Sequence, residues 1–178
     1  MAGSEQHHTL ALPSFDAPVR LAIVVSPYYR DIADALVAGA RGVAAQVGAE
    51  VEVIEMPGAL EIAPAIAICE RGQGFDGYVA LGCVIRGETT HYDTVCNDSS
   101  RALTLLGLQG TCIGNGILTV EHRDQAVVRA EPEGQNKGGG AAAAALHLIA
   151  LRRKLAAPRG QIGFRTDEHL TKGEGTLL

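Results

Sequence analysis

The sequence has no tryptophan, and aromatic residues make up only 4% of its 178 residues. A core built on large rings is therefore excluded, and the 22 glycines together with many alanines indicate close packing of small side chains. An excess of basic residues is also missing, because the formal net charge is -5. Since nucleic-acid binding favours a basic face, we expect no nucleic acid as partner, although a local basic pocket for one phosphate stays open.

Long apolar runs and cysteine motifs are missing as well. No apolar stretch reaches the ~20 residues that span a bilayer. The start, MAGSEQHHTLALPSF, lacks the basic region and long apolar core of a signal peptide. No two of the four cysteines are two or three residues apart, so the sequence shows no zinc or redox pair: Cys69, Cys83, Cys96 and Cys112. We interpret them as buried free thiols, which fits a reducing cytoplasm. Because no long apolar stretch is present, we expect no association with a membrane.

Strand-like apolar runs alternate with segments of helical period along most of the chain. With 47% hydrophobic residues, the chain is suited to one compact domain, here placed at 18–157. The alternation predicts an α/β fold with a parallel sheet of about four strands and helices on both faces. The expected strands are 21–26, 51–56, 77–85 and 111–120, and the expected helices are 31–47, 60–71, 93–106, 121–130 and 137–155.

The two ends of the chain have no such pattern. Residues 1–17 are predicted to be a loose N-terminal arm, in which Thr9–Leu12 could pair as a short edge strand. Residues 158–178 are polar and contain glycine without a helical period, so they are predicted to be a flexible C-terminal tail.

Side chains of different chemical types come directly after the predicted strands. The carboxyl ends of parallel strands form the edge of the sheet where ligands bind. Tyr28 follows the first strand and could stack on a flat heterocycle or simply be a rim tyrosine. Glu61 follows the second and could accept hydrogen bonds from hydroxyls or favour its own helix N-terminus. His91 follows the third; an imidazole moves protons in both directions near neutral pH, but a lone histidine is more often structural or exposed.

A second group of residues has the chemistry of an anion site. Residues 87–90 come just before a helix, where backbone N–H groups and the helix dipole favour an anion. The segment matches no standard phosphate-loop motif, and the threonines could simply cap the helix. Arg129 and Lys137 are natural phosphate partners, although each could equally be a solvated surface charge.

Several stretches of the sequence carry a family resemblance. They are PGALEI at 57–62, ALGCVIRGETTHYDTVCN at 80–97, GILTV at 116–120, and the segments at 125–129 and 136–138. In this order they cover most of the chain, from about 21 to 155, and IRGETTHYD is long and unusual. The sequence therefore resembles the lumazine synthase family of riboflavin biosynthesis.

The resemblance implies a reaction and an assembly. The reaction condenses 5-amino-6-(D-ribitylamino)uracil with 3,4-dihydroxy-2-butanone 4-phosphate to 6,7-dimethyl-8-ribityllumazine, phosphate and water, with no cofactor and no metal. The implied fold is a flavodoxin-like three-layer αβα sandwich. The implied assembly is a homopentamer in the cytoplasm, with active sites between subunits and the late arginine and lysine coming from the neighbour.

The resemblance also assigns a role to each matching residue. His91 is implied as the proton-transfer group, and Glu88, Thr89 and Arg129 as the phosphate site. The implied substrate-binding residues are Tyr28, Ala59, Leu60, Glu61, Cys83, Val84, Ile85, Asn115 and Lys137.

Two positions within the resemblance depart from the family pattern. Asn115 stands where many members carry a second aromatic residue, and Pro27 where an arginine is frequent. A non-catalytic module that keeps the pocket for storage or sensing, and a structural shell protein, stay open as alternatives to the enzyme.

Overall fold

Four parallel strands form one sheet: β1 (Arg20–Val25), β2 (Glu50–Glu55), β3 (Gly77–Ile85) and β4 (Ile113–Val120). Their order in the computed structural model, which describes residues 9–72 and 74–156, is β2-β1-β3-β4. This order matches the start of the flavodoxin-like order. β2 is added on one side of β1, and β3 and β4 are added on the other side. The predicted strands and their parallel pairing are confirmed.

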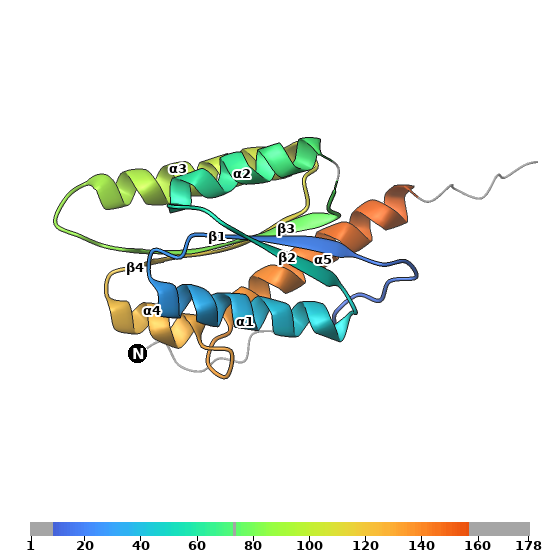
Figure 1. Ribbon diagram of the computed structural model, residues 1–178, viewed down its shortest axis with the longest axis horizontal. Coiled ribbons are helices and arrows are strands. Elements are labelled where there is room, and N and C mark those ends of the chain that lie inside the picture. Colours follow the sequence, from blue (N-terminus) through green and yellow to red (C-terminus); the bar gives the residue numbers. More distant parts are fainter. Residues whose placement is uncertain (1–8, 73, 157–178) are drawn as a thin grey trace, which may run out of the picture.

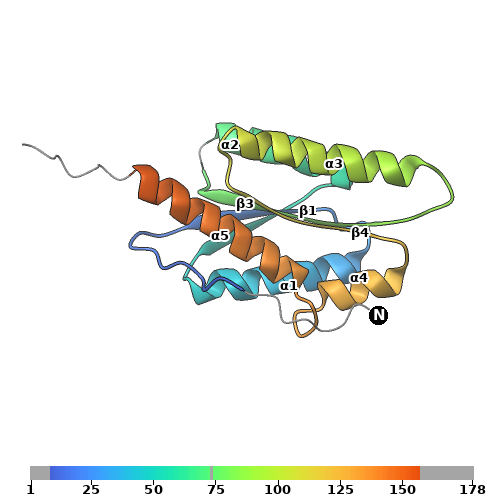
Figure 2. The ribbon, with the colours of Figure 1, turned by 180° about the vertical axis from the view of Figure 1, so that it is seen from behind.

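Helices cover both faces of the sheet (Figure 1). One layer contains α1 (Arg30–Gln46), α4 (Arg123–Ala130) and α5 (Lys137–Ala156). The other contains α2 (Ala59–Arg71) and α3 (His91–Leu108). The reverse view shows α5 crossing the sheet on the side of α1 and α4 (Figure 2). The predicted three-layer αβα sandwich is therefore confirmed.

The central strand β1 shows why the sheet needs cover on both faces. Leu21, Ile23 and Val25 belong to the core cluster under α1, α4 and α5. The alternate residues Ala22 and Val24 belong to the cluster under α2 and α3. Because successive side chains of a strand point to opposite faces, a continuous apolar run fills two cores at once.

Glycines allow α5 to lie directly against its neighbours. A Cβ on Gly138 would collide with the backbone carbonyl of Leu36 in α1, and one on Gly114 would collide with the carbonyl of Ala141. The apolar residues of α5 that face the sheet are small or fully buried, among them Ala142, Ala145 and Leu146. The small residues at the start of α5 therefore pack α5 against its own subunit.

The described part of the N-terminal arm differs from the expectation. Thr9–Leu12 forms no strand, and the described chain has no regular structure before β1. Side-chain contacts hold the arm instead, because Leu12 and Phe15 pack against the core. Pro13, directly after this segment, has no N–H to offer a sheet ladder.

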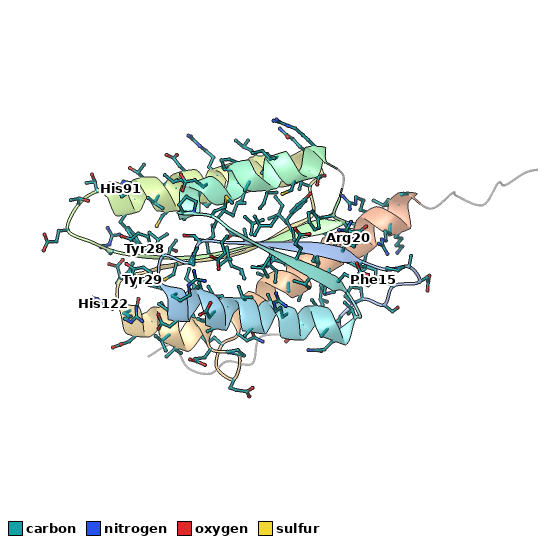
Figure 3. The ribbon with its side chains drawn as sticks, viewed as in Figure 1. Phe15, Arg20, Tyr28, Tyr29, His91 and His122 are labelled. Atoms are coloured by element: carbon teal, nitrogen blue, oxygen red, sulfur yellow. The ribbon has the colours of Figure 1, made fainter. Side chains whose placement is uncertain are left out.

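The end of α5 is fastened to the start of β1. Arg153 donates hydrogen bonds to the carbonyl oxygens of Ala17 and Pro18, at 2.8 and 2.6 Å, and its guanidinium lies 5.4 Å from the centre of the Phe15 ring. Arg153 also donates to Asp76 Oδ1 at 3.0 Å, and the N–H of Arg20 donates to Asp76 Oδ2 at 2.9 Å. Phe15 and Arg20 lie together at one end of the molecule (Figure 3).

No helix in the described part of the chain is both long and apolar enough to span a membrane. The expected tail at 158–178 lies outside the described residues. The division of the chain into arm, domain and tail remains a prediction.

Candidate active site

The carboxyl ends of the strands bring distant segments together. Tyr28 and Tyr29 follow β1, and His91 begins α3 after β3; all three lie at the same end of the sheet, opposite Phe15 and Arg20 (Figure 3). Two helices and two strands, α1 to β3, separate Tyr28 from His91 in the sequence, and the parallel topology brings them to one edge.

A cavity of about 500 Å³ opens at this end of the sheet, and we call it the strand-end cavity. It has the size of a small-molecule site. Nine of the predicted site residues line it: Tyr28, Ala59, Leu60, Glu61, Cys83, Val84, Ile85, Thr89 and His91. One cavity therefore holds a ring, a carboxylate, apolar strand residues, a hydroxyl and an imidazole.

Tyr28 presents a free ring face to this cavity. Its side chain is 74% exposed, and its ring meets that of Tyr29 edge to face, with centroids 5.1 Å apart. Tyr29 is half-buried and packs against the core, so it supports the exposed ring from behind. The edge contact leaves the face of Tyr28 available for stacking on a flat heterocycle.

Glu61 lies in the first turn of α2 and folds back over Gly58, the residue before the helix. A Cβ on Gly58 would lie 2.6 Å from Glu61 Oε2, so only glycine leaves the carboxylate in this position. The N–H of Glu61 donates to the Gly58 carbonyl at 3.2 Å. The carboxylate is thus both near a helix N-terminus and in the cavity, and the two interpretations of Glu61 are compatible.

The segment between β3 and α3 forms the polar rim of the cavity. The helix begins at His91, and the His91 N–H donates to Thr89 Oγ1 at 3.4 Å. Thr90, directly before the helix, makes no side-chain cap. The predicted position of residues 87–90 before a helix N-terminus is confirmed, and the one capping contact comes from Thr89.

Cys83 lies in the wall of the cavity as a free thiol. Burial raises its pKa to about 11, with a smaller opposing effect from Arg123. The thiol is therefore protonated near neutral pH, whereas the thiolate is the reactive form. The other three cysteines are also free thiols whose pKa burial raises. Only Cys112 is fully buried; Cys69, Cys83 and Cys96 are half-buried, so the expected burial is confirmed for Cys112 alone.

The remaining cationic residues of the predicted site lie elsewhere. Arg129 and Lys137, together with Asn115, line a second cavity of about 360 Å³ beside β4, the last strand of the sheet; we call it the edge cavity. Arg129 donates to the Gln125 carbonyl at 2.9 Å, within its own helix. One chain thus carries the predicted site as two separate groups of residues.

Asn115 is held by its own strand. Its Oδ1 accepts a hydrogen bond from the Ile117 N–H at 3.0 Å. The two N–H donors of the NH₂ group and the second lone pair of Oδ1 are left to meet a ligand.

Glu88 is exposed in the segment after β3 and is not among the residues that line either cavity. Four further side chains line the strand-end cavity and were not predicted as site residues: Ser26, Tyr29, Tyr92 and Val95. Helical spacing could have identified Val95, which lies four residues after His91 on the same helix face.

Ion pairs between distant residues surround both cavities. Arg123, at the start of α4, donates to Asp31 Oδ2 at 2.5 Å and lies 5.9 Å from the centre of the Tyr29 ring. The hydrogen bond from Arg123 lowers the pKa of Asp31. Arg86 pairs with Glu121 and Asp93 next to the rim.

Side chains of several kinds line the two cavities. Across residues 9–72 and 74–156, no group of three or more histidine, cysteine, aspartate or glutamate residues is placed to hold a metal ion. The two cavities offer ring stacking, hydroxyl recognition, an imidazole and two cations, which suit proton transfer and binding of an anionic group.

Comparisons with known proteins identify a family. The sequence model described as 6,7-dimethyl-8-ribityllumazine synthase matches residues 18–153. A protein of that name from Jannaschia sp. (strain CCS1) is 59% identical over 165 residues, 93% of this chain and 92% of the relative. Namesakes from Novosphingobium aromaticivorans and Methylorubrum extorquens (strain PA1) are 52% and 53% identical; they match 74% and 77% of this chain and 95% and 83% of their own lengths.

Proposed function

The chain belongs to the 6,7-dimethyl-8-ribityllumazine synthase family, and on that premise we propose that it is a transferase of riboflavin biosynthesis. It condenses 5-amino-6-(D-ribitylamino)uracil with 3,4-dihydroxy-2-butanone 4-phosphate to 6,7-dimethyl-8-ribityllumazine, phosphate and water. The observation that carries this proposal is the strand-end cavity, which gathers Tyr28, Glu61 and His91 from three strand ends.

The strand-end cavity binds the pyrimidine substrate in this proposal. The exposed ring of Tyr28 stacks on the heterocycle, and the half-buried strand end at Cys83–Ile85 lines its other edge. Ala59 and Leu60 hold the ribityl chain. The Glu61 carboxylate accepts hydrogen bonds from the ribityl hydroxyls, which ionised carboxylates do strongly.

The phosphate substrate binds where the two cavities meet in the assembled protein. Thr89 supplies a hydroxyl at the N-terminus of α3, and Glu88 belongs to the same segment. Arg129 supplies a cation, and Lys137 lies beside it toward the pyrimidine. The separation of these cations from His91 within one chain supports a site completed by a second copy.

His91 transfers protons in the reaction. The substrate amine attacks the ketone and water leaves to form an imine. Phosphate is then eliminated, and the ribitylamino nitrogen closes the ring with loss of a second water. Each step moves a proton at nitrogen, carbon or oxygen, and a positioned imidazole can both accept and return it. Holding the two substrates together contributes as well, because it makes the condensation effectively intramolecular.

We place the protein in the cytoplasm as a homo-oligomer with a pentamer as its basic unit. An apolar cavity of about 580 Å³ between α3 and α5 supports the assembly, together with the exposed side chains of Leu108, Leu151 and Leu155 around it. Large exposed apolar patches are typical of protein–protein contacts. The free thiols are compatible with a reducing compartment.

A two-substrate assay tests the proposal. The protein is mixed with both substrates, and the absorbance of the lumazine product is followed, with the phosphate substrate omitted in a control. Turnover that requires both substrates is expected. Tight lumazine binding without turnover would indicate a storage or sensing module, and large particles without activity would indicate a shell protein.

A further inference from the structure

Arg86 joins three elements directly beside the strand-end cavity. It is the first residue after β3, and its N–H donates to the Val120 carbonyl at the end of β4, at 3.0 Å. Its Nε donates to Glu121 Oε2 at 2.7 Å. Both terminal nitrogens lie 3.3 Å from Asp93 Oδ1 in the first turn of α3.

The guanidinium also covers an aromatic ring. The Arg86 carbon Cζ lies 4.0 Å from the centre of the Tyr92 ring, which is close for a cation–π contact. Arg86 therefore contacts the two residues that follow His91, namely Tyr92 and Asp93. It does so without lining the cavity that His91 lines.

This arrangement leaves Arg86 poorly suited to bind the substrate phosphate itself. Two carboxylates already neutralise its charge and occupy its donors, and the ring of Tyr92 covers one face of the guanidinium. An arginine that binds a phosphate presents its fork of donors to the anion. The Arg86 donors are directed at Asp93 and Glu121 instead, which indicates a structural role for the side chain.

Residues 87–90 lie between Arg86 and the residues of α3 that Arg86 contacts. Arg86 anchors the chain at one end, and its contacts with Tyr92 and Asp93 anchor the first turn of α3 at the other. Within the turn, the Asp93 N–H donates to the Thr90 carbonyl at 3.0 Å. The segment that carries Thr89 and leads to His91 is thus closed into a short loop by one side chain.

The same contacts continue to the edge cavity. The Glu121 N–H donates to Gln125 Oε1 at 3.0 Å, and the Gln125 carbonyl accepts from Arg129 at 2.9 Å. Arg86, Glu121 and Gln125 therefore link the loop at His91 to the helix that presents Arg129.

We propose that Arg86 is a positioning residue, which through Asp93 and Glu121 holds residues 87–90 and the first turn of α3 in the geometry that binds phosphate and aims His91. The proposal rests on the proposed function. We expect this network to affect the reaction rate more than the stability of the whole protein. Exposed ion pairs contribute little to global stability, whereas displacing a catalytic group by about 1 Å can lower the rate by on the order of 10²-fold.

The experiment compares R86M, D93N and E121Q. Each removes one partner of the network. R101M is the matched control, because Arg101 lies on α3, the helix that carries Asp93, and pairs with Asp98 at 3.4 Å on the surface. The readouts are kcat, the KM of each substrate, and amide hydrogen exchange of residues 87–93.

All three network variants are expected to lower kcat/KM for the phosphate substrate by about 10- to 100-fold, while KM for the pyrimidine changes by less than about 3-fold. Faster exchange at residues 87–93 should accompany the loss. R101M should stay within about 2-fold of wild type in all readouts. R86K should recover part of the activity, because it keeps the charge but cannot reach both carboxylates with a planar fork.

Effects of opposite sign on phosphate affinity, in R86M on one side and in D93N and E121Q on the other, would overturn the proposal. If Arg86 binds phosphate directly, R86M loses phosphate affinity while D93N and E121Q keep or gain it, because they free the guanidinium. Unchanged kinetics and exchange in R86M would also overturn it. If R86M does not fold, D93N, E121Q and R86K decide the question. An inactive wild type would count against the proposed function alone, since the exchange data test the loop independently of turnover.

Discussion

His91 and Arg129 line two different cavities of the same chain. His91 lies in the strand-end cavity at the start of α3, whereas Arg129 lies in the edge cavity beside β4. A reaction that needs proton transfer next to a bound phosphate needs both groups at one place. We infer that the edge cavity of one copy completes the strand-end cavity of the next.

Replacing His91 with alanine tests proton transfer. We expect H91A to lower kcat by ~10²–10⁴-fold, the usual contribution of a general acid–base group, with little change in pyrimidine binding. Steady-state kinetics and a pH–rate profile measure the effect. H122A is the control, because His122 is exposed and precedes α4 without lining either cavity. Wild-type turnover in H91A would remove His91 from the mechanism.

Replacing Arg129 and Glu61 separately tests the division of labour between the two cavities. R129A should raise the KM of the phosphate substrate by about 10- to 100-fold, as expected for one charge-assisted hydrogen bond, and spare the pyrimidine. E61Q should do the reverse, because in the proposed site the Glu61 carboxylate accepts hydrogen bonds from the ribityl hydroxyls. Measuring both KM values for both variants checks the assignment. Equal weakening of the two substrates in either variant would indicate a folding defect instead.

The Asp76 carboxylate predicts a pH-dependent contribution to stability. Burial raises its pKa, but the hydrogen bonds from the Arg20 N–H and from Arg153, together with the charges of Arg153 and Arg152, outweigh burial and bring the pKa below the ordinary value. A lowered folded-state pKa stabilises the fold fully above the unfolded-state pKa, about 3.9, and this stabilisation is lost as the pH falls through the folded-state value.

D76N should therefore lower the melting temperature at pH 7, and the difference from wild type should narrow only below about pH 4. Thermal unfolding at a series of pH values measures it. D98N serves as the control, since its partner Arg101 is largely exposed. A gap that widens on acidification would contradict a lowered pKa for Asp76 in the folded state.

Replacing Gly138 tests the close approach of α5 and α1. G138A should destabilise the protein by at least ~1–3 kcal/mol, the usual cost of overpacking, because the added methyl would meet the backbone of Leu36 rather than a movable side chain. G42A is the matched control in α1: nothing lies within 4 Å of its added Cβ, so about 0.5–1 kcal/mol of stabilisation is expected. Denaturant unfolding compares them. Equal effects would refute the packing argument.

Local pattern was enough to predict the sheet, all five helices and the position of Tyr28, Glu61 and His91 at the ends of strands. The family resemblance, not the pattern, supplied Ala59, Leu60 and the strand end at 83–85, and four side chains of the strand-end cavity were missed. Periodicity identifies buried strands and helix faces, and parallel topology then brings their ends together, as for Tyr28 and Glu61. Long-range side-chain pairing was beyond reach. Asp31, in the first turn of α1, pairs with Arg123, which is 92 residues away, and no local pattern indicates that partner. The contacts of Arg86 with Glu121 and Asp93 were missed for the same reason.

The N-terminal arm shows the opposite error. Thr9–Leu12 has the composition of a short strand, but a strand also needs a partner with free ladder groups. Within the described chain, the arm is held by the packing of Leu12 and Phe15 and by Arg153. Composition alone does not distinguish these two ways of fixing a segment.

Complementation between two impaired variants, measured at a phosphate-substrate concentration well below the raised KM of R129A, tests the shared site most directly. H91A keeps an intact edge cavity, and R129A keeps an intact strand-end cavity, so their co-assembly creates some sites with both His91 and Arg129. With equal amounts and random assortment, about a quarter of the sites are restored, and activity should recover to about that fraction of wild type. Activity no greater than the sum of the two parent variants, in particles shown to contain both chains, would contradict a site shared between copies.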